Sequence, residues 1–158
     1  MNNESFLRSM RTALAEGLLF RFTAKGYSMS PFIKNDDVLT VAPASRHALR
    51  LGDIAVFIHP VTRDLCVHRI VGVMRGNVLV KADNGFDQDG VIRLADILGV
   101  IVYVQRGKTV ISWGLGIERV IIAFLSRVCF FPLVLYPLRR GRAYLRNKAG
   151  RNKINFKV

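Results

Sequence analysis

The chain has 158 residues and a formal net charge of +13, and 51% of its residues are hydrophobic while 22% are charged. This length and composition fit one globular domain with appendages, part of which is unusually hydrophobic. Eight basic residues and no acidic ones lie between Arg139 and Val158, so the rest of the chain carries only +5. The charge therefore excludes a uniformly basic domain and predicts contacts with phosphate groups at the C-terminal tail.

The sequence shows no motif for binding a metal ion or a nucleotide. His47, His59 and His68 are scattered along the chain, and no Cys-x-x-Cys pair occurs. Neither of the common glycine-rich phosphate loops is present. We therefore expect no cofactor and no metal ion.

Residues 1–25 contain an amphipathic pattern. Between Glu4 and Phe22, apolar residues recur at spacings of three and four: Phe6, Met10, Ala13, Leu14 and Leu18. This spacing predicts one helix with a single apolar face, which either packs on the domain or lies on a membrane surface. The segment lacks the continuous apolar core of a signal peptide, and it is too polar to span a bilayer.

Residues 26–112 follow a strand pattern, in which short apolar runs alternate with turn residues. Residues 61–64 have the length of a hairpin connection, and residues 83–90 form a loop rich in Asp and Gly. The predicted strands cover residues 38–41, 54–58, 65–73, 78–81, 98–105 and 109–111. The predicted fold class is therefore mainly β, with a barrel-like domain.

Residues 113–138 are the hydrophobic part of the chain, and residues 139–158 are its basic tail. The stretch 120–138 has nearly the length that spans hydrocarbon, but it contains Arg127, which disfavours insertion, and Pro132, which kinks a helix. It is therefore a poor transmembrane helix, a kinked helix in the membrane interface, or a helix packed on the domain. The tail favours contact with anionic lipid and, if the helix spans, places the β domain outside the cytoplasm.

The stretch around Ser28 has special backbone properties. Gly26 can adopt a positive φ, and Pro31 fixes φ and donates no hydrogen bond. A strand that ends between these residues would present the Ser28 hydroxyl at the rim of a cleft. The alternative is a polar turn with no chemical role.

His68 is the residue that could activate this hydroxyl. It lies in a predicted apolar strand, where it is either a core residue or the general base for Ser28. Asp83 and Asp89 lie in the loop after the next strand. Either carboxylate could orient the imidazole in a Ser-His-Asp arrangement, or could simply be a turn or cap residue.

Four sequence boxes occur in the order expected of one family: residues 26–31, 51–57, 67–71 and 81–84. Together they resemble the boxes of type I signal peptidases and their self-cleaving repressor relatives, over about residues 26–104. The resemblance implies a signal-peptidase-like β-barrel or β-clip catalytic domain, with Ser28 as nucleophile and His68 as base. The chain is similar to the branch of the family that uses histidine, in which Asp83 matches the acid of a Gly-Asp-Asn motif and Asp89 matches a second acid.

The chain departs from the family in three places. Ala82 replaces the glycine of the Gly-Asp-Asn motif, and Gly26 stands where some members carry a serine that helps to hold the oxyanion. That donor would then come from the backbone, including the Ser28 N–H. The usual spanning helix before the first box is replaced by the amphipathic segment. Lys81 is an alternative base that ranks below His68, because it lies in the next box.

The expected function is a membrane-associated serine endopeptidase that cleaves after small residues. Its expected partners are a secreted or membrane precursor polypeptide and, through residues 117–158, membrane lipid. No nucleic acid is expected, and the catalytic domain is expected outside the cytoplasm. Two alternatives stay open: a non-catalytic relative that holds a peptide in the same cleft, and a nucleic-acid-binding protein that cleaves itself.

Overall fold

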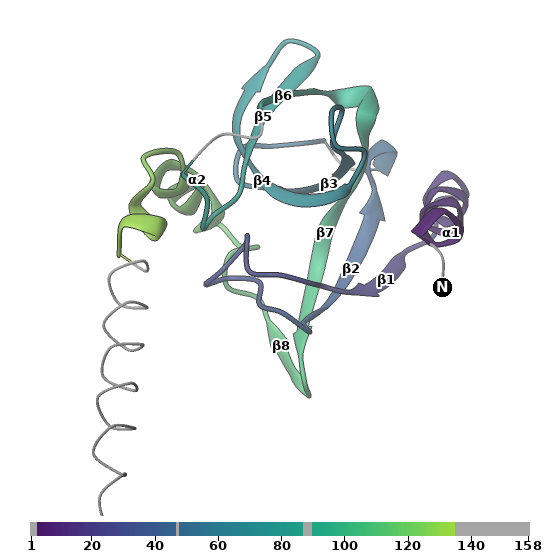
Figure 1. The fold of residues 1–158 in the computed structure, drawn as a ribbon, viewed down its shortest axis with the longest axis horizontal. Coiled ribbons are helices and arrows are strands. Elements are labelled where there is room, and N and C mark those ends of the chain that lie inside the picture. The colour runs from purple at the N-terminus through teal and green to yellow at the C-terminus, as the bar shows by residue number, and fades with distance from the viewer. Residues whose placement is uncertain (1–2, 47, 87–89, 135–158) are drawn as a thin grey trace, which may run out of the picture.

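The computed structural model describes residues 3–46, 48–86 and 90–134 of the chain. This part is mainly β, as predicted, and consists of one eight-stranded antiparallel sheet with helices on either side of it (Figure 1). The strands are β1 (Phe20–Thr23), β2 (Val38–Pro43), β3 (Ile54–Ile58), β4 (Leu65–Met74), β5 (Asn77–Lys81), β6 (Gly90–Arg93), β7 (Ile97–Arg106) and β8 (Thr109–Ile111). Short 3-10 turns at Ala44–Arg46 and Leu94–Asp96 follow β2 and β6.

All six predicted strands occur, and their observed ends lie within two residues of the predicted ones. The hairpin predicted at residues 61–64 joins β3 to β4, which pair antiparallel from Ile54 with Arg69 to Ile58 with Leu65. The sequence did not predict β1 and β6. Both are four-residue strands at the two ends of the sheet. An end strand has a neighbouring strand on one side only, so few of its side chains are fully buried and its apolar pattern is weak.

The order of strands in the sheet determines the direction of each strand. They follow the order β1-β2-β7-β3-β4-β5-β6, with β8 paired to β7, and every pairing is antiparallel. Four antiparallel steps separate β1 from β4 in this order. Figure 1 shows that the sheet is strongly curved, with β3 to β6 wound round one end and β1, β2 and β7 extending away from it.

The N-terminal helix is shorter than predicted. Helix α1 spans Asn3–Ala15, and the chain leaves it at Gly17, whose φ of 79° suits glycine. The N–H groups of Gly17 and Leu18 donate to carbonyls in the last turn, as at many helix C-termini. The apolar periodicity that continues to Leu18 is therefore accidental: this side chain is exposed, and the next residues form β1.

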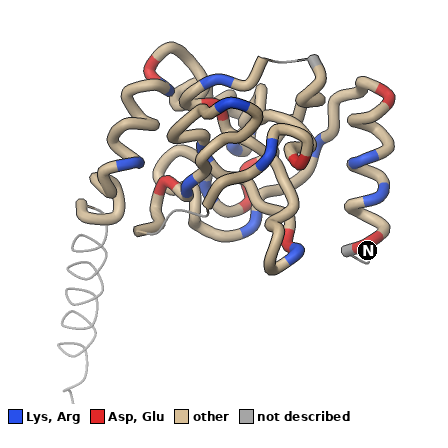
Figure 2. Tube along the Cα trace, turned by 90° about the horizontal axis from the view of Figure 1, so that it is seen from above, with Lys and Arg blue, Asp and Glu red and all other residues tan. Residues whose placement is uncertain are grey.

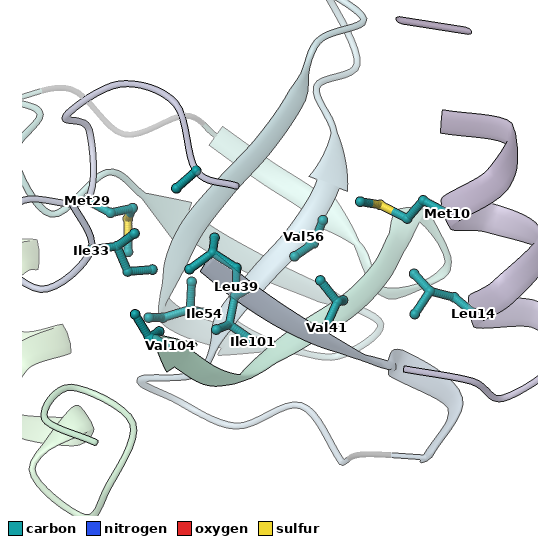
Figure 3. Close-up of a cluster of buried hydrophobic side chains, with 11 residues drawn as sticks. Met10, Leu14, Met29, Ile33, Leu39, Val41, Ile54, Val56, Ile101 and Val104 are labelled. Atoms are coloured by element: carbon teal, nitrogen blue, oxygen red, sulfur yellow. The ribbon is translucent and has the colours of Figure 1, made fainter. Parts of the chain in front are cut away.

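Helix α1 packs on the domain. Met10 and Leu14 are buried in the main core cluster with Leu39, Val41 and Val56 of the sheet. We call residues 24–37, which connect β1 to β2, the Ser28 segment. Figure 3 shows the helix residues on one side of the cluster and two residues of the Ser28 segment, Met29 and Ile33, on the other. Figure 2 shows that residues of both charge signs lie along α1. The core therefore fixes both α1 and the Ser28 segment relative to the sheet.

The hydrophobic C-terminal segment is divided rather than continuous. Helix α2 spans Arg119–Arg127, and Cys129 has a φ of 58° that interrupts the helix before a further helical turn at residues 130–134. Pro132, at which a kink was predicted, lies three residues after this interruption, within the turn that follows it. Ile122, Ala123 and Ser126 are buried, and the Arg127 guanidinium donates to the Val71 carbonyl of β4.

Within the described residues, we find no helix with the length and apolarity needed to cross a membrane. Residues 135–138 of the predicted hydrophobic segment and the whole basic tail, residues 139–158, lie outside the described part.

A buried carboxylate holds the end of the Ser28 segment against β7. Asp37 accepts hydrogen bonds from the Arg106 guanidinium, at 2.7 and 2.8 Å, and from the Lys34 N–H. Arg106 also donates to the Phe32 carbonyl. Burial disfavours the charged form of Asp37, but the bonds from Arg106 and Lys34 outweigh this effect and hold the pKa of the carboxyl below its ordinary value of 3.8.

We expect Asp37→Asn to lower the free energy of unfolding at pH 7 by about 1.5–3 kcal/mol, the usual range for hydrogen bonds to charged groups. Because the pKa of Asp37 is lowered in the folded state, its contribution to the free energy of unfolding is complete above pH 3.8. That contribution is lost as the pH falls through the pKa of the folded state. The difference in free energy of unfolding between the wild type and Asp37→Asn should therefore shrink in acid. Urea unfolding followed by circular dichroism between pH 3 and pH 7 measures it.

The matched control is Asp36→Asn. Asp36 pairs with Lys25 at the surface and has a φ of 69°, a conformation that asparagine tolerates. We expect this substitution to lower the free energy of unfolding much less than Asp37→Asn does. Equal losses in the two variants, or a difference that grows in acid, would contradict the role assigned to Asp37.

Candidate active site

Ser28 lies in a turn between β1 and β2. The prediction that it lies at the end of a strand is wrong, because β1 ends at Thr23 and the next strand begins at Val38. Gly26 has the positive φ expected of it, 97°. Met29 anchors the turn in the core, since its side chain is buried and its carbonyl accepts from two N–H groups that follow. The neighbouring Ser28 is exposed.

His68 lies on β4, opposite Ala55 of β3. Its ring is half-buried and meets the Phe57 ring edge to face, with centroids 6.2 Å apart. The imidazole therefore packs on Phe57 while the residue as a whole stays partly accessible to solvent.

Ser28 and His68 line the same groove, which has a volume of about 430 Å³. One wall consists of residues 22–26, the end of β1 and its continuation; the other wall consists of residues 65–68 of β4. The remaining lining residues come from α1, the Ser28 segment and β2: Phe6, Met29, Ile33 and Leu39.

Both walls of the groove have an open backbone edge. Strand β1 is the last strand of the sheet on its side. The pairing of β4 with β5 begins at Arg69, so residues 65–68 pair with β3 alone among the described strands. Two such edges facing one groove can accept an extended polypeptide by main-chain hydrogen bonding.

Asp83, the first of the two predicted carboxylates, binds Arg69. The Arg69 guanidinium donates to both carboxylate oxygens, with Nε–Oδ1 at 2.9 Å and Nη2–Oδ2 at 2.8 Å, and both side chains are fully buried. Arg69 is not among the residues that line the groove. Asp83 is therefore engaged by Arg69, and Asp89, the second predicted carboxylate, lies outside the described residues.

The rest of the Arg69 guanidinium is also satisfied. Its Nη1 donates to the carbonyls of Gly52 and Gly114, both at 2.9 Å, and its carbon lies 5.2 Å from the centre of the Phe32 ring. Gly52 and Gly114 have φ values of 91° and 95°. A side chain at position 52 would also collide with the Arg119 backbone, at 2.6 Å. A buried charge is tolerated only with such complete pairing.

The loop after β5 connects this buried pair to the Ser28 turn. The Asn84 N–H donates to the Ser28 carbonyl at 2.8 Å, and the Asn84 side chain donates to the Tyr27 carbonyl at 3.3 Å. Lys81 is fully buried, and its Nζ donates to the carbonyls of Ala82 and Gly85 within the same loop. Lys81 does not line the groove. We therefore interpret it as a support of the loop rather than a base for Ser28.

Sequence reasoning missed the structural roles of Arg69 and Asn84. A signal was present for Arg69, because a charged residue in the middle of a buried apolar strand needs a partner of opposite charge. Asn84 gave no such signal, since its bonds to the Ser28 turn depend on how the loop folds back.

The described residues contain no group of three His, Cys, Asp or Glu side chains that could hold a metal ion. No protein-family model matches the chain, and a comparison with curated proteins gives no match either. Function must therefore be inferred from the residues and the groove.

We expect Asp83→Asn to lower the free energy of unfolding by about 3–5 kcal/mol, because it leaves the buried Arg69 charge without its counter-ion. Equilibrium unfolding in urea measures the loss. The matched control is Asp96→Asn, which breaks the exposed pair of Arg93 and Asp96 and should change stability little. Similar effects of the two substitutions would show that the buried pair does not support the fold.

Proposed function

We propose that this protein is a serine endopeptidase that resembles the signal peptidases of the Ser-His branch, with Ser28 as nucleophile and His68 as general base. The observation that carries the proposal is that these two residues, from separate segments, line one open groove. The groove is bordered by two strand edges that can hold a polypeptide. The fold is mainly β, which agrees with the resemblance, and the finer signal-peptidase-like barrel is part of the proposal.

The substrate would bind as an extended strand between β1 and β4. Main-chain hydrogen bonds to residues 22–26 and 65–68 would align it, and the groove would receive its side chains. The residue before the cleaved bond is small, as the resemblance implies, which lets the peptide carbonyl approach the Ser28 hydroxyl closely.

The reaction would proceed through an acyl-enzyme. The Ser28 oxygen attacks the peptide carbonyl carbon while His68 takes the hydroxyl proton. Backbone N–H groups of the turn, including that of Ser28, stabilise the oxyanion. His68 then gives its proton to the leaving amine as the C–N bond breaks, and water releases the acyl group by the same steps in reverse.

In this mechanism, Asp83 has a supporting role. It holds Arg69, and the loop that carries it is bonded to the Ser28 turn through Asn84. The orienting carboxylate of the Ser-His-Asp arrangement is then assigned to Asp89, the second acid of the branch that the chain resembles.

The C-terminal part would hold the enzyme at a membrane. Helix α2 buries one face against the domain and leaves Ile121 and Phe124 about two-thirds exposed, with Ile117 at 93% just before it. The sequence that follows ends in the basic tail, residues 139–158, so apolar and cationic groups would meet an anionic lipid surface together. We therefore propose a membrane-associated peptidase whose catalytic domain lies outside the cytoplasm.

We expect Ser28→Ala to abolish both peptide cleavage and covalent labelling by a fluorophosphonate. His68→Ala should lower the cleavage rate by about 10²–10⁴-fold, the usual contribution of a general base. Mass spectrometry of the labelled protein and of cleaved precursor peptides measures both effects. The controls are Ser9→Ala on α1 and His59→Ala in the β3–β4 turn, which should keep wild-type activity.

Full activity in the Ser28 and His68 variants would refute the peptidase. If the wild-type chain binds peptides but is never labelled at Ser28, and Ser28→Ala binds equally well, the protein is the non-catalytic peptide-binding relative.

We expect the double substitution Ile121→Asp and Phe124→Asp to lower binding to vesicles of anionic phospholipid by about tenfold or more, because it places charges on the face proposed to enter the interface. Sedimentation with the vesicles measures binding. Val91→Asp is the matched control, since this valine is also exposed but lies on β6. Unchanged vesicle binding in the double variant would exclude α2 from the lipid contact.

A further inference from the structure

We propose that a second hollow in the molecule, beside α1, binds an organic phosphate monoester through the guanidinium groups of Arg11, Arg63 and Arg93. We call it the arginine hollow. It has a volume of about 710 Å³ and is lined by residues of α1, the end of β3, the β3–β4 turn, β6 and the chain that joins β6 to β7. It shares no lining residue with the groove of Ser28 and His68. The site is therefore independent of the proposed peptidase.

Three elements that are far apart in the sequence bring the three arginines to the arginine hollow. Arg11 lies on α1, where the neighbouring Met10 is fully buried and fixes the helix on the core. Arg63 lies in the β3–β4 turn, and its N–H donates to the His59 carbonyl at 3.0 Å. Arg93 is the last residue of β6. Each arginine is thus carried by a backbone segment that packing or hydrogen bonding holds in place.

The arginine hollow carries an excess of positive charge. Asp96 is the one acidic side chain among its described lining residues, and it binds Arg93, with Nε–Oδ2 at 2.8 Å and Nη2–Oδ1 at 3.0 Å. The side chains of Arg11 and Arg63 make no hydrogen bond or ion pair with another residue that the structure describes. Three guanidinium groups and one carboxylate leave a formal charge of +2. These like charges repel one another unless an anion lies between them.

A phosphate monoester matches this charge and these hydrogen-bond donors. It carries about −1.5 to −2 charges at pH 7 and has three oxygens that accept strong hydrogen bonds. The planar guanidinium fork fits such oxygens with paired hydrogen bonds. Asp96 already orients the Arg93 guanidinium, and Nη1 of Arg93 takes no part in that ion pair. One of the three donors is therefore held in place before the ligand binds.

The rest of the arginine hollow is apolar and suits the organic part of such a ligand. Ile92 is buried in the second core cluster, and Leu98 packs against the main core cluster. Beside them, the lining includes Ile58, Pro60 and Val91. A volume of about 710 Å³ lies within the range of about 300–1,000 Å³ that is usual for sites of small molecules. An aliphatic or aromatic body attached to the phosphate would displace water from these side chains.

A soluble phosphate ester and a phospholipid headgroup could both supply this chemistry, and the position of the hollow favours the soluble source. Helices α1 and α2 lie on opposite sides of the domain (Figures 1 and 2). The exposed apolar residues proposed to meet lipid are on α2, whereas the arginine hollow includes Arg11 of α1. A chain bound to a membrane through α2 would hold the hollow away from that membrane.

The test is isothermal titration calorimetry of the full chain with phenyl phosphate at pH 7.5. We expect one binding site. Arg11→Gln and Arg63→Gln should each weaken binding by about tenfold or more, because each removes hydrogen bonds between charged groups. Phenyl sulfate has a similar shape but one negative charge, so it should bind about tenfold or more weakly than phenyl phosphate. Unchanged affinity in both variants would overturn the site.

The matched controls are Arg8→Gln and Arg75→Gln. Arg8 lies one turn before Arg11 on α1, and Arg75 lies in the β4–β5 turn, much as Arg63 lies in the β3–β4 turn. Both are exposed and neither lines the arginine hollow. These variants lose the same charge and should keep the wild-type affinity. Losses equal to those of Arg11→Gln and Arg63→Gln would show that binding follows net charge, and would overturn the site.

Two further ligands test the class and the source of the phosphate. Phthalate, an aromatic dianion with two carboxylates, should bind more weakly than phenyl phosphate; tighter binding would overturn the phosphate in favour of acidic polypeptides. Vesicles of phosphatidylcholine and phosphatidic acid should bind Arg63→Gln as well as Arg8→Gln. Selective loss of vesicle binding in Arg63→Gln, with no binding of phenyl phosphate to the wild type, would keep the phosphate site and overturn its soluble source. No binding of either ligand would overturn the site altogether.

Discussion

The buried ion pair between Arg69 and Asp83 connects parts of the molecule that strand pairing alone does not join. Arg69 follows His68 on β4, and Asp83 begins the loop that is hydrogen-bonded to the Ser28 turn. The same guanidinium binds the carbonyls of Gly52 and Gly114, which lie before β3 and before α2. Because an unpaired charge in this position would be very costly, these segments can adopt their arrangement only together.

The groove is a consequence of the way the sheet curves. A flat antiparallel sheet would place β1 and β4 far apart, whereas the curved sheet brings their edges to one groove, as the lining residues show (Figure 1). The same core cluster holds the Ser28 segment from one side and α1 from the other (Figure 3). The two segments that carry Phe6 and Ser28 to the groove are therefore held by core packing, which is what a site for an extended peptide requires.

The sequence predicted those features that depend on local pattern. Apolar runs bounded by turn residues located six strands, and Gly26 has a positive φ, which its residue type allows. Prediction from the sequence failed where the pattern was ambiguous. The helical spacing of apolar residues continues past Gly17 into β1, but pairing with β2 determines the conformation of that strand. The need of Arg69 for a partner of opposite charge could be read from the sequence, but the choice of Asp83 as that partner depends on how the loop after β5 folds.

The central claim is that Ser28 and His68 act on a polypeptide held in this groove. Its most direct test is an experimentally determined structure of the chain after reaction with a peptidyl boronate. We predict a bond from boron to the Ser28 oxygen, a His68 nitrogen about 2.6–3.2 Å from that oxygen, and the peptide extended between β1 and β4. An adduct on another residue, or a His68 ring that points away from the bound peptide, would contradict the claim.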